Sequence, residues 1–229
     1  MRFLTRKKSI SIFGIRAVGK TAYISMLVNI LSNQQNIKKL RVLSGYDYYM
    51  QMMNWILRGE GPPPNKTYER LLIHLSMEVD GKKIELRTYD VAGGDIERMG
   101  DVFKALIDVG DGYLFLVEPT RDPDKHVTQV KLIYKLIEYL TEKFKKRTKK
   151  PLALAFTKND IYGIKDPKKA FFEYTVPVFN LSQVFYYLKN YEFFAVSAFG
   201  GDLEQIRSEG RTATPIDIEK PFFWLLKQI

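Results

Sequence analysis

Eight consecutive residues near the start of the chain have the types and spacing of a phosphate-binding loop. They run from Gly14 to Thr21 and fit the pattern G-x-x-x-x-G-K-[ST]. Glycines let the backbone wrap around phosphate oxygens, the ammonium group of Lys20 reaches the terminal phosphates, and the hydroxyl of Thr21 can bind Mg²⁺. The expected chemistry is the binding of a nucleoside triphosphate. The residues expected around its phosphates are Gly14, Ile15, Arg16, Ala17, Val18, Gly19, Lys20, Thr21 and Ala22.

A second group of candidate residues lies at Asp90 to Gly93, which fits the pattern D-x-x-G. The carboxylate of Asp90 can hold the magnesium ion through water, and the amide of Gly93 can approach the third phosphate because no side chain intervenes. Alone the pattern is weak evidence, since Asp and Gly often mark turns. After a phosphate loop it predicts the metal side of the same site.

A third group of residues indicates which base is bound. Residues 157–160 read Thr-Lys-Asn-Asp and fit [NT]-K-x-D. The Asp accepts hydrogen bonds from two donors on the guanine edge, whereas adenine would leave the carboxylate and its own acceptor unpaired. The methylene stem of Lys158 can lie along the base, and the amide of Ala198 could donate to the guanine oxygen. The residues expected to select guanine are Thr157, Lys158, Asp160, Ser197 and Ala198.

Strands and helices must bring these three groups together. Residues 9–13 read as a short buried strand, and apolar residues recur at helical spacing over 23–31, so the phosphate loop joins a strand to a helix. Residues 83–90 alternate as a half-exposed strand does, and the apolar runs 151–156 and 193–196 precede the base-selecting residues. Each motif therefore follows a predicted strand at its carboxyl end.

In this order the motifs resemble those of the Ras-like small GTPases of the translation-factor-related class, over nearly the whole chain. The resemblance implies a P-loop NTPase of the α/β class. Its sheet would be doubly wound and mostly parallel, with six strands, one antiparallel edge strand and helices on both faces. It also implies a cycle between GTP and GDP states with bound Mg²⁺. Within that class, residues 61–67 and 221–226 resemble the prokaryotic double-GTPase group.

Residues 1–229 are expected to form a single G domain with two insertions. The first is a short helix at about 45–58, before the first switch. The prolines at 62–64 favour an extended backbone that leads to Thr67, then to an edge strand through Leu72. We expect Thr67 to bind Mg²⁺ together with Thr21 and Asp90. The alternative is that Thr67 is only a loop residue. The other candidates for this role are less suitable: Thr88 lies inside a predicted strand, and Ser44 and Ser76 are poorer substitutes for a threonine.

The second insertion is expected at about 161–180, between the Thr-Lys-Asn-Asp motif and the last strand, before a helix at 181–189. It contains four aromatic residues, which we expect to pack the insertion onto the domain; a partner site is the alternative. These aromatic residues are Phe171, Phe172, Tyr174 and Phe179.

The catalytic residues depart from the pattern of the family. Gly94 stands where Ras-like proteins usually carry the glutamine that positions water. Arg16 stands where Ras has glycine and where the Rheb branch, which the loop resembles, has arginine. Its guanidinium could obstruct an arginine from an activating protein or supply positive charge in cis. We expect slow magnesium-dependent GTP hydrolysis; the alternative is a GTP-binding scaffold with negligible hydrolysis. The residues assigned to catalysis are Lys20, Gly93, Arg16 and Thr67.

The composition limits location and partners. There is no cysteine, which excludes disulfides and cysteine-bound metals and suits a reducing cytoplasm, and no apolar stretch approaches the roughly 18 residues of a spanning helix. Regulatory or effector proteins are expected at the switch regions near 60–70 and 91–100. The chain has 36 basic against 26 acidic residues, and the basic run from Lys143 to Lys150 could contact a membrane surface or a nucleic acid. The alternative is a solvated helix end.

Overall fold

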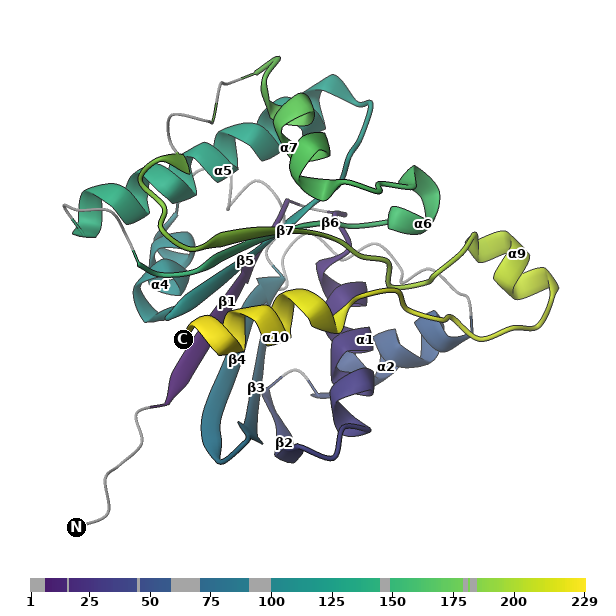
Figure 1. Ribbon diagram of the computed structural model, residues 1–229. Helices are drawn as coiled ribbons and strands as arrows, with labels where there is room; N and C mark the ends of the chain where they lie inside the picture. Colours follow the sequence, from purple (N-terminus) through teal and green to yellow (C-terminus); the bar gives the residue numbers. More distant parts are fainter. Residues whose placement is uncertain are drawn as a thin grey trace, which may run out of the picture.

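A seven-stranded sheet forms the centre of the protein, with the strand order β2-β3-β4-β1-β5-β6-β7 (Figure 1). The computed structural model describes residues 7–15, 17–44, 46–58, 71–90, 100–144, 149–178, 181 and 185–229. The strands are β1 (Lys8–Phe13), β2 (Ile37–Ser44), β3 (Leu71–Val79), β4 (Lys82–Asp90), β5 (Gly112–Val117), β6 (Leu152–Phe156) and β7 (Tyr191–Ala195).

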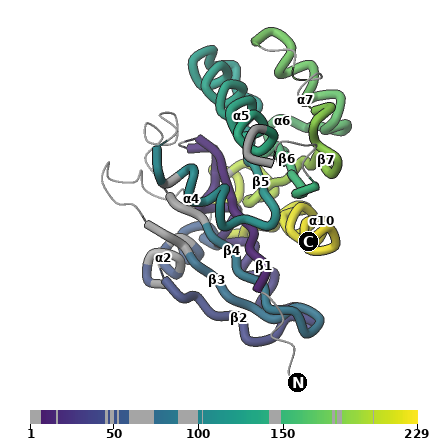
Figure 2. Tube along the Cα trace, turned by 90° about the vertical axis from the view of Figure 1, so that its left-hand side faces the viewer, coloured from purple at the N-terminus to yellow at the C-terminus, as the bar shows by residue number. Residues whose placement is uncertain are grey.

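Helices cover both faces of this sheet. They are α1 (Lys20–Ser32), α2 (Tyr46–Leu57), α4 (Asp101–Val109), α5 (Pro123–Phe144), α6 (Asn159–Tyr162), α7 (Pro167–Thr175), α9 (Leu203–Ser208) and α10 (Glu219–Gln228). Helices α1 and α10 lie on one face, and α4, α5 and α7 lie on the other (Figures 1 and 2). Helix α2 packs beside α1. In the part of the chain that the structure describes, no helix is long and apolar enough to cross a membrane.

The mostly parallel, doubly wound architecture expected from the motifs is confirmed, with one strand more than the expected six. The additional strand is β2, which pairs with β3 and forms the edge of the sheet. Strand β3, expected at the edge, therefore lies second. It is antiparallel to both of its neighbours, whereas the described pairs from β4 to β7 are parallel. The alternation in β2 is interrupted at Lys39, which has a positive φ of 54° beside a shift in register.

The central strands are apolar because they are covered on both faces. Every residue of β5 and of β6 is buried. On one face, the ring of Phe13 in β1 meets that of Phe103 in α4, with centroids 5.1 Å apart. Helix α2 lies within the range 45–58, where the sequence predicts an additional helix, and its Ile56 is fully buried in the common core. This packing holds in place the central strands, whose carboxyl ends lead into the phosphate loop and the Thr-Lys-Asn-Asp motif.

The aromatic residues of the second expected insertion pack onto the domain. Phe171 of α7 is fully buried, and its ring lies 4.9 Å from that of Phe193 in β7. Phe172 and Tyr174 also pack against the core, whereas Phe179 lies outside the described residues. The expected helix at 181–189 is too long: Phe185 is helical and its amide donates to the carbonyl oxygen of Leu181, whereas residues 186–189 form a turn, a bridge and a bend before β7.

Candidate nucleotide site

The phosphate loop forms the expected turn between β1 and α1. Gly14 is required there by close packing: a Cβ on it would lie 2.7 Å from Cγ1 of Val18 and 3.1 Å from the carbonyl oxygen of Leu116. Lys20 is buried, and its Nζ donates to the carbonyl oxygens of Gly14 and Ile15, each at 2.9 Å. The ammonium group is therefore held across the loop, where it can neutralise phosphate charge.

The start of α1 suits an anion and its metal ion. Gly19, with φ 94° and ψ 19°, directly precedes the helix and makes no side-chain cap. A Cβ on Gly19 would meet nothing within 4 Å, so there is open space beside the first helical amides. Amides at a helix start bind phosphate, and the half-buried Thr21 adds a hydroxyl oxygen of the kind that Mg²⁺ prefers. The residues present thus fit a magnesium-bound phosphate chain.

Three groups of residues that are far apart in sequence line one pocket next to this loop. The pocket is formed by the start of α1, by the segment after β6 and by the segment after β7. Its lining residues are Gly19, Ala22, Tyr23, Thr157, Lys158, Asp160, Val196, Ser197, Ala198, Phe199 and Ile218. All five residues expected to select guanine are among them.

The Asp160 carboxylate is oriented by the hydroxyl of Ser197. Oγ of Ser197 donates to Oδ1 of Asp160 at 2.5 Å and accepts from the amides of Phe199 at 3.3 Å and Gly200 at 2.9 Å. A hydroxyl has one hydrogen and two acceptor lone pairs. Both lone pairs are used by amides, so the hydrogen is directed to Asp160. Ser197 is therefore a positioning residue for the carboxylate.

Lys158 is held in the pocket wall by a buried acid that the sequence motifs do not include. It has left-handed backbone angles, φ 58° and ψ 36°, and its Nζ lies 2.5 Å from Oε1 of Glu118. Glu118 directly follows β5 and is 6% exposed. Its amide donates to Oε1 of Gln129 at 2.8 Å, and its carbonyl oxygen accepts from Nε2 of Gln129 at 2.9 Å. The sequence signal that could have pointed to Glu118 is its position directly after an apolar strand, where the other residues of the candidate site also lie.

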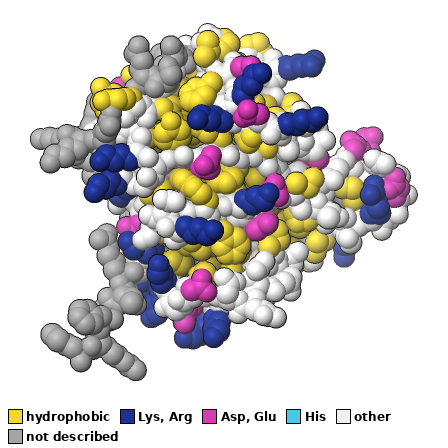
Figure 3. Space-filling model, viewed as in Figure 1, with side chains coloured by type: hydrophobic (Ala, Val, Ile, Leu, Met, Phe, Trp, Pro, Cys, Tyr) yellow, Lys and Arg dark blue, Asp and Glu magenta, His cyan; other side chains and the backbone are white. Residues whose placement is uncertain are grey.

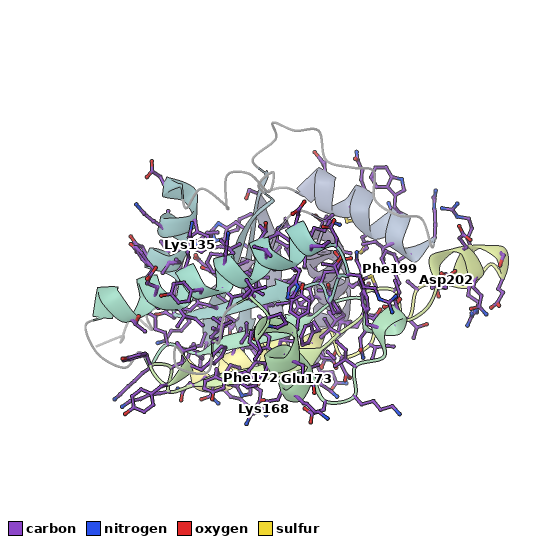
Figure 4. All side chains as sticks on the ribbon, turned by 90° about the horizontal axis from the view of Figure 1, so that it is seen from above. Lys135, Lys168, Phe172, Glu173, Phe199 and Asp202 are labelled. Carbon is purple, nitrogen blue, oxygen red and sulfur yellow. The ribbon has the colours of Figure 1, made fainter. Side chains whose placement is uncertain are left out.

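An arm from Phe199 to Asp217, which contains α9, projects from the domain after β7 and comes back to the start of α10 (Figures 1 and 4). Its base is a short antiparallel ladder, in which the amides of Ser197 and Ile216 each donate to the other residue's carbonyl oxygen, at 3.0 and 2.8 Å. Gly200 has φ 72°, and a Cβ on it would lie 1.7 Å from the carbonyl oxygen of Thr214. The arm thus closes tightly on Ser197 because residue 200 is glycine.

Comparison with known proteins supports the fold. No protein-family model matches the sequence, and no curated protein shows significant sequence similarity. A solved structure of the Arl6 (BBS3) small GTPase from Trypanosoma brucei, with the nucleotide analogue GppNp bound, is similar in fold. The TM-score is 0.52 at 13% sequence identity, and the match covers 97% of this chain and 96% of that one. The chain has the small G-protein fold.

Within the small G-protein fold, the metal and catalytic residues expected from the sequence are placed only in part. Asp90 ends β4, which is hydrogen-bonded to β1, so it lies at the same end of the sheet as the phosphate loop; its side chain lies outside the described part. Arg16, Thr67 and Gly93 also lie outside it. Among the described residues, no group of three His, Cys, Asp or Glu side chains could hold a metal ion by itself.

Proposed function

We propose that this protein binds GTP and GDP with Mg²⁺ and acts as a molecular switch. The observation that supports the proposal best is the shared pocket, in which Gly19 of the phosphate loop and Ala22 of α1 meet Asp160 and Ala198. A site for phosphates and a site for a guanine edge are thus continuous. A solved small GTPase of similar fold carries the nucleotide analogue GppNp.

Each group in the site has a separate task. Lys20 and the first amides of α1 bind the β- and γ-phosphates, and Thr21, Asp90 and Thr67 hold Mg²⁺. When bound, Mg²⁺ supplies charge neutralisation on the phosphate oxygens. Asp160, oriented by Ser197, accepts the two donors of the guanine edge, and the Ala198 amide donates to the guanine oxygen.

We propose that intrinsic hydrolysis is slow. Gly94 has no side chain to position water, which slows the intrinsic reaction. Arg16 obstructs the approach of an arginine from an activating protein, which limits how far such a protein can accelerate hydrolysis. The same Gly94 favours a second candidate function, a GTP-binding scaffold with negligible hydrolysis. Single-turnover hydrolysis by the unmodified protein, by Arg16→Gly and by Gly94→Gln distinguishes a slow GTPase from a scaffold with negligible hydrolysis. Trimming Arg16 should leave the rate unchanged or higher, whereas a fall of about tenfold, or about 1.4 kcal/mol, would establish a cis-arginine role.

The proposed partners contact the switch regions near 60–70 and 91–100, where the two nucleotide states would differ. We propose a cytoplasmic location because the sequence has no cysteine. Membership of the prokaryotic double-GTPase group stays a prediction from residues 61–67 and 221–226.

The nucleotide itself gives the direct test. Nucleotide released from the purified protein by denaturation should be GDP or GTP, and GDP should bind at least about a hundredfold more tightly than ADP, because ADP leaves buried polar groups unpaired. Equal affinity for the two would overturn the guanine assignment.

A further inference from the structure

The opposite end of the sheet carries a group of lysines from three separate segments. Lys7 directly precedes β1 and Lys8 begins it. Lys38 and Lys39 are the second and third residues of β2, and Lys82 and Lys83 begin β4 after the turn at Asp80 and Gly81. We call this group the lysine end; its members are Lys7, Lys8, Lys38, Lys39, Lys82 and Lys83. Basic side chains are visible at this lower edge of the molecule, beside fewer acidic ones (Figure 3).

The strand register brings these lysines side by side. Lys38 pairs with Glu78, Glu78 pairs with Lys83, and Lys8 pairs with Ile84, one residue beyond Lys83. Neighbouring strands are about 4.8 Å apart, so the row across β2, β3, β4 and β1 is about 15 Å wide. The charges therefore act together on any surface that faces this end.

The lysine end has a surplus of positive charge. Lys38, Lys82 and Lys83 are exposed, and the side chain of Lys7 is 63% exposed. The carboxylates placed among them are Glu78, Asp80, Glu85 and Asp111, whose Oδ2 accepts from the amide of Ser9 at 3.0 Å.

Both carboxylates that lie on strands are already neutralised within the protein. Glu78 bonds to Lys39 at 2.8 Å, and the hydrogen bond and charge of Lys39 lower the pKa of its carboxyl. Glu85 is buried among Lys7, Arg87 and His74. With Arg87 included, the seven cations named here exceed the four carboxylates by three.

We propose that the lysine end docks the protein reversibly on an anionic phospholipid surface. Clusters of about four to eight lysines or arginines attract anionic lipid headgroups, and this one has six. It consists of lysine alone, a hydrated point charge, whereas nucleic-acid recognition relies largely on the planar fork of arginine. This composition favours a lipid surface over a nucleic acid.

Docking at this end leaves the nucleotide pocket accessible. Strand β1 has six residues and runs from Lys8 to the phosphate loop, so the two ends are about 20 Å apart. The basic run expected at Lys143 to Lys150 is a weaker candidate. Nζ of Lys150 donates to the carbonyl oxygen of Gly110 and to the hydroxyl of Tyr113, so this ammonium group is engaged within the domain.

Vesicle sedimentation tests the proposal with two matched variants. Lys38→Gln/Lys82→Gln/Lys83→Gln removes three exposed charges from the lysine end, and Lys165→Gln/Lys168→Gln/Lys169→Gln removes three exposed charges around α7. The vesicles are phosphatidylcholine alone or with about one third phosphatidylserine. The unmodified protein should bind only the anionic vesicles. The first variant should bind at least about tenfold more weakly, and the second should bind within about twofold of the unmodified protein.

Further measurements test whether vesicle binding depends on the charge of the lysine end. Raising the salt from about 0.1 M to about 1 M shortens the Debye length from about 10 Å to about 3 Å and should abolish binding. Lys38→Arg/Lys82→Arg/Lys83→Arg should keep it, which shows that charge rather than folding is at issue. Equal loss in both glutamine variants, binding to phosphatidylcholine alone, or tighter binding to a labelled RNA duplex would each overturn the proposal.

Discussion

The two ends of the sheet use lysine in opposite ways. At the carboxyl end, Lys20 is buried under two carbonyl oxygens and Lys158 is paired with the buried Glu118. At the amino end, Lys82 and Lys83 are exposed in a group with surplus charge. A lysine fixed by partners can recognise one chemical group at one position, whereas exposed lysines attract any anionic surface and act additively. Single substitutions should therefore matter at the first end and accumulate at the second.

The largest effect should come from Lys20→Ala. The change removes the only side-chain cation that the described phosphate loop places over its own carbonyls, so GDP affinity should fall by about a thousandfold or more. Titration calorimetry measures it. Lys168→Ala, an exposed lysine on α7, is the control and should leave GDP affinity unchanged. Similar GDP affinity in both variants would contradict the view that the buried Lys20 has a specific role that an exposed lysine lacks.

Asp160→Asn should have the next largest effect. An amide at residue 160 presents a donor to a donor of guanine, so GDP affinity should fall by about a hundredfold. Xanthosine diphosphate, which has an acceptor at that position, should bind the variant better than GDP. Competition between the two nucleotides measures the preference. A variant that still prefers GDP would show that Asp160 does not read the base.

Gly200→Ala tests whether the arm supports the pocket. The new Cβ would lie 1.7 Å from the carbonyl oxygen of Thr214, so the base of the arm must open, and the hydrogen bond from the Gly200 amide to Ser197 should weaken. We expect GDP affinity to fall by about tenfold and stability by about 2 to 3 kcal/mol.

Gly210→Ala is the matched control for this change. Gly210 has a similar positive φ of 61°, but a Cβ there meets nothing within 4 Å. The Gly210→Ala variant should be about 1 kcal/mol less stable because of backbone strain, and its GDP affinity should be unchanged. If the two substitutions changed GDP affinity equally, the closure of the arm at Gly200 would not be what supports the pocket.

The smallest effect concerns acid stability at the lysine end. Burial raises the pKa of Glu85, but hydrogen bonds from Lys7, Arg87 and His74 outweigh it and lower this pKa from 4.5 to about 2. A lowered folded-state pKa stabilises the fold above the unfolded value, and this contribution is lost as the pH falls from 4.5 toward 2. Denaturation across this range should show a smaller loss of stability in Glu85→Gln, because that variant has no carboxylate at residue 85 to protonate. An unchanged pH dependence would contradict the assignment.

The sequence predicts the site best where the chemistry is local. The phosphate loop, the Thr-Lys-Asn-Asp motif and Ser197-Ala198 each depend on short spacings, and the fold class follows from the strands before them. Strand β2 was missed because the bulge at Lys39 interrupts its alternation. The need for glycine at residue 200 depends on Thr214, which only the folded arm brings near. The lysine end was missed because each segment contributes only two residues, and their proximity depends on strand register.

The closure of the arm has a kinetic consequence under the proposed function. Ser197 is held by Ile216 through its backbone and by Gly200 through its hydroxyl, and the same hydroxyl orients Asp160. We therefore expect that opening the base of the arm would also weaken the hydrogen bond that orients the Asp160 carboxylate. If the protein binds GDP as proposed, we expect the rate of GDP dissociation to rise as that base opens more often, so a protein that binds α9 could change this rate without touching the nucleotide.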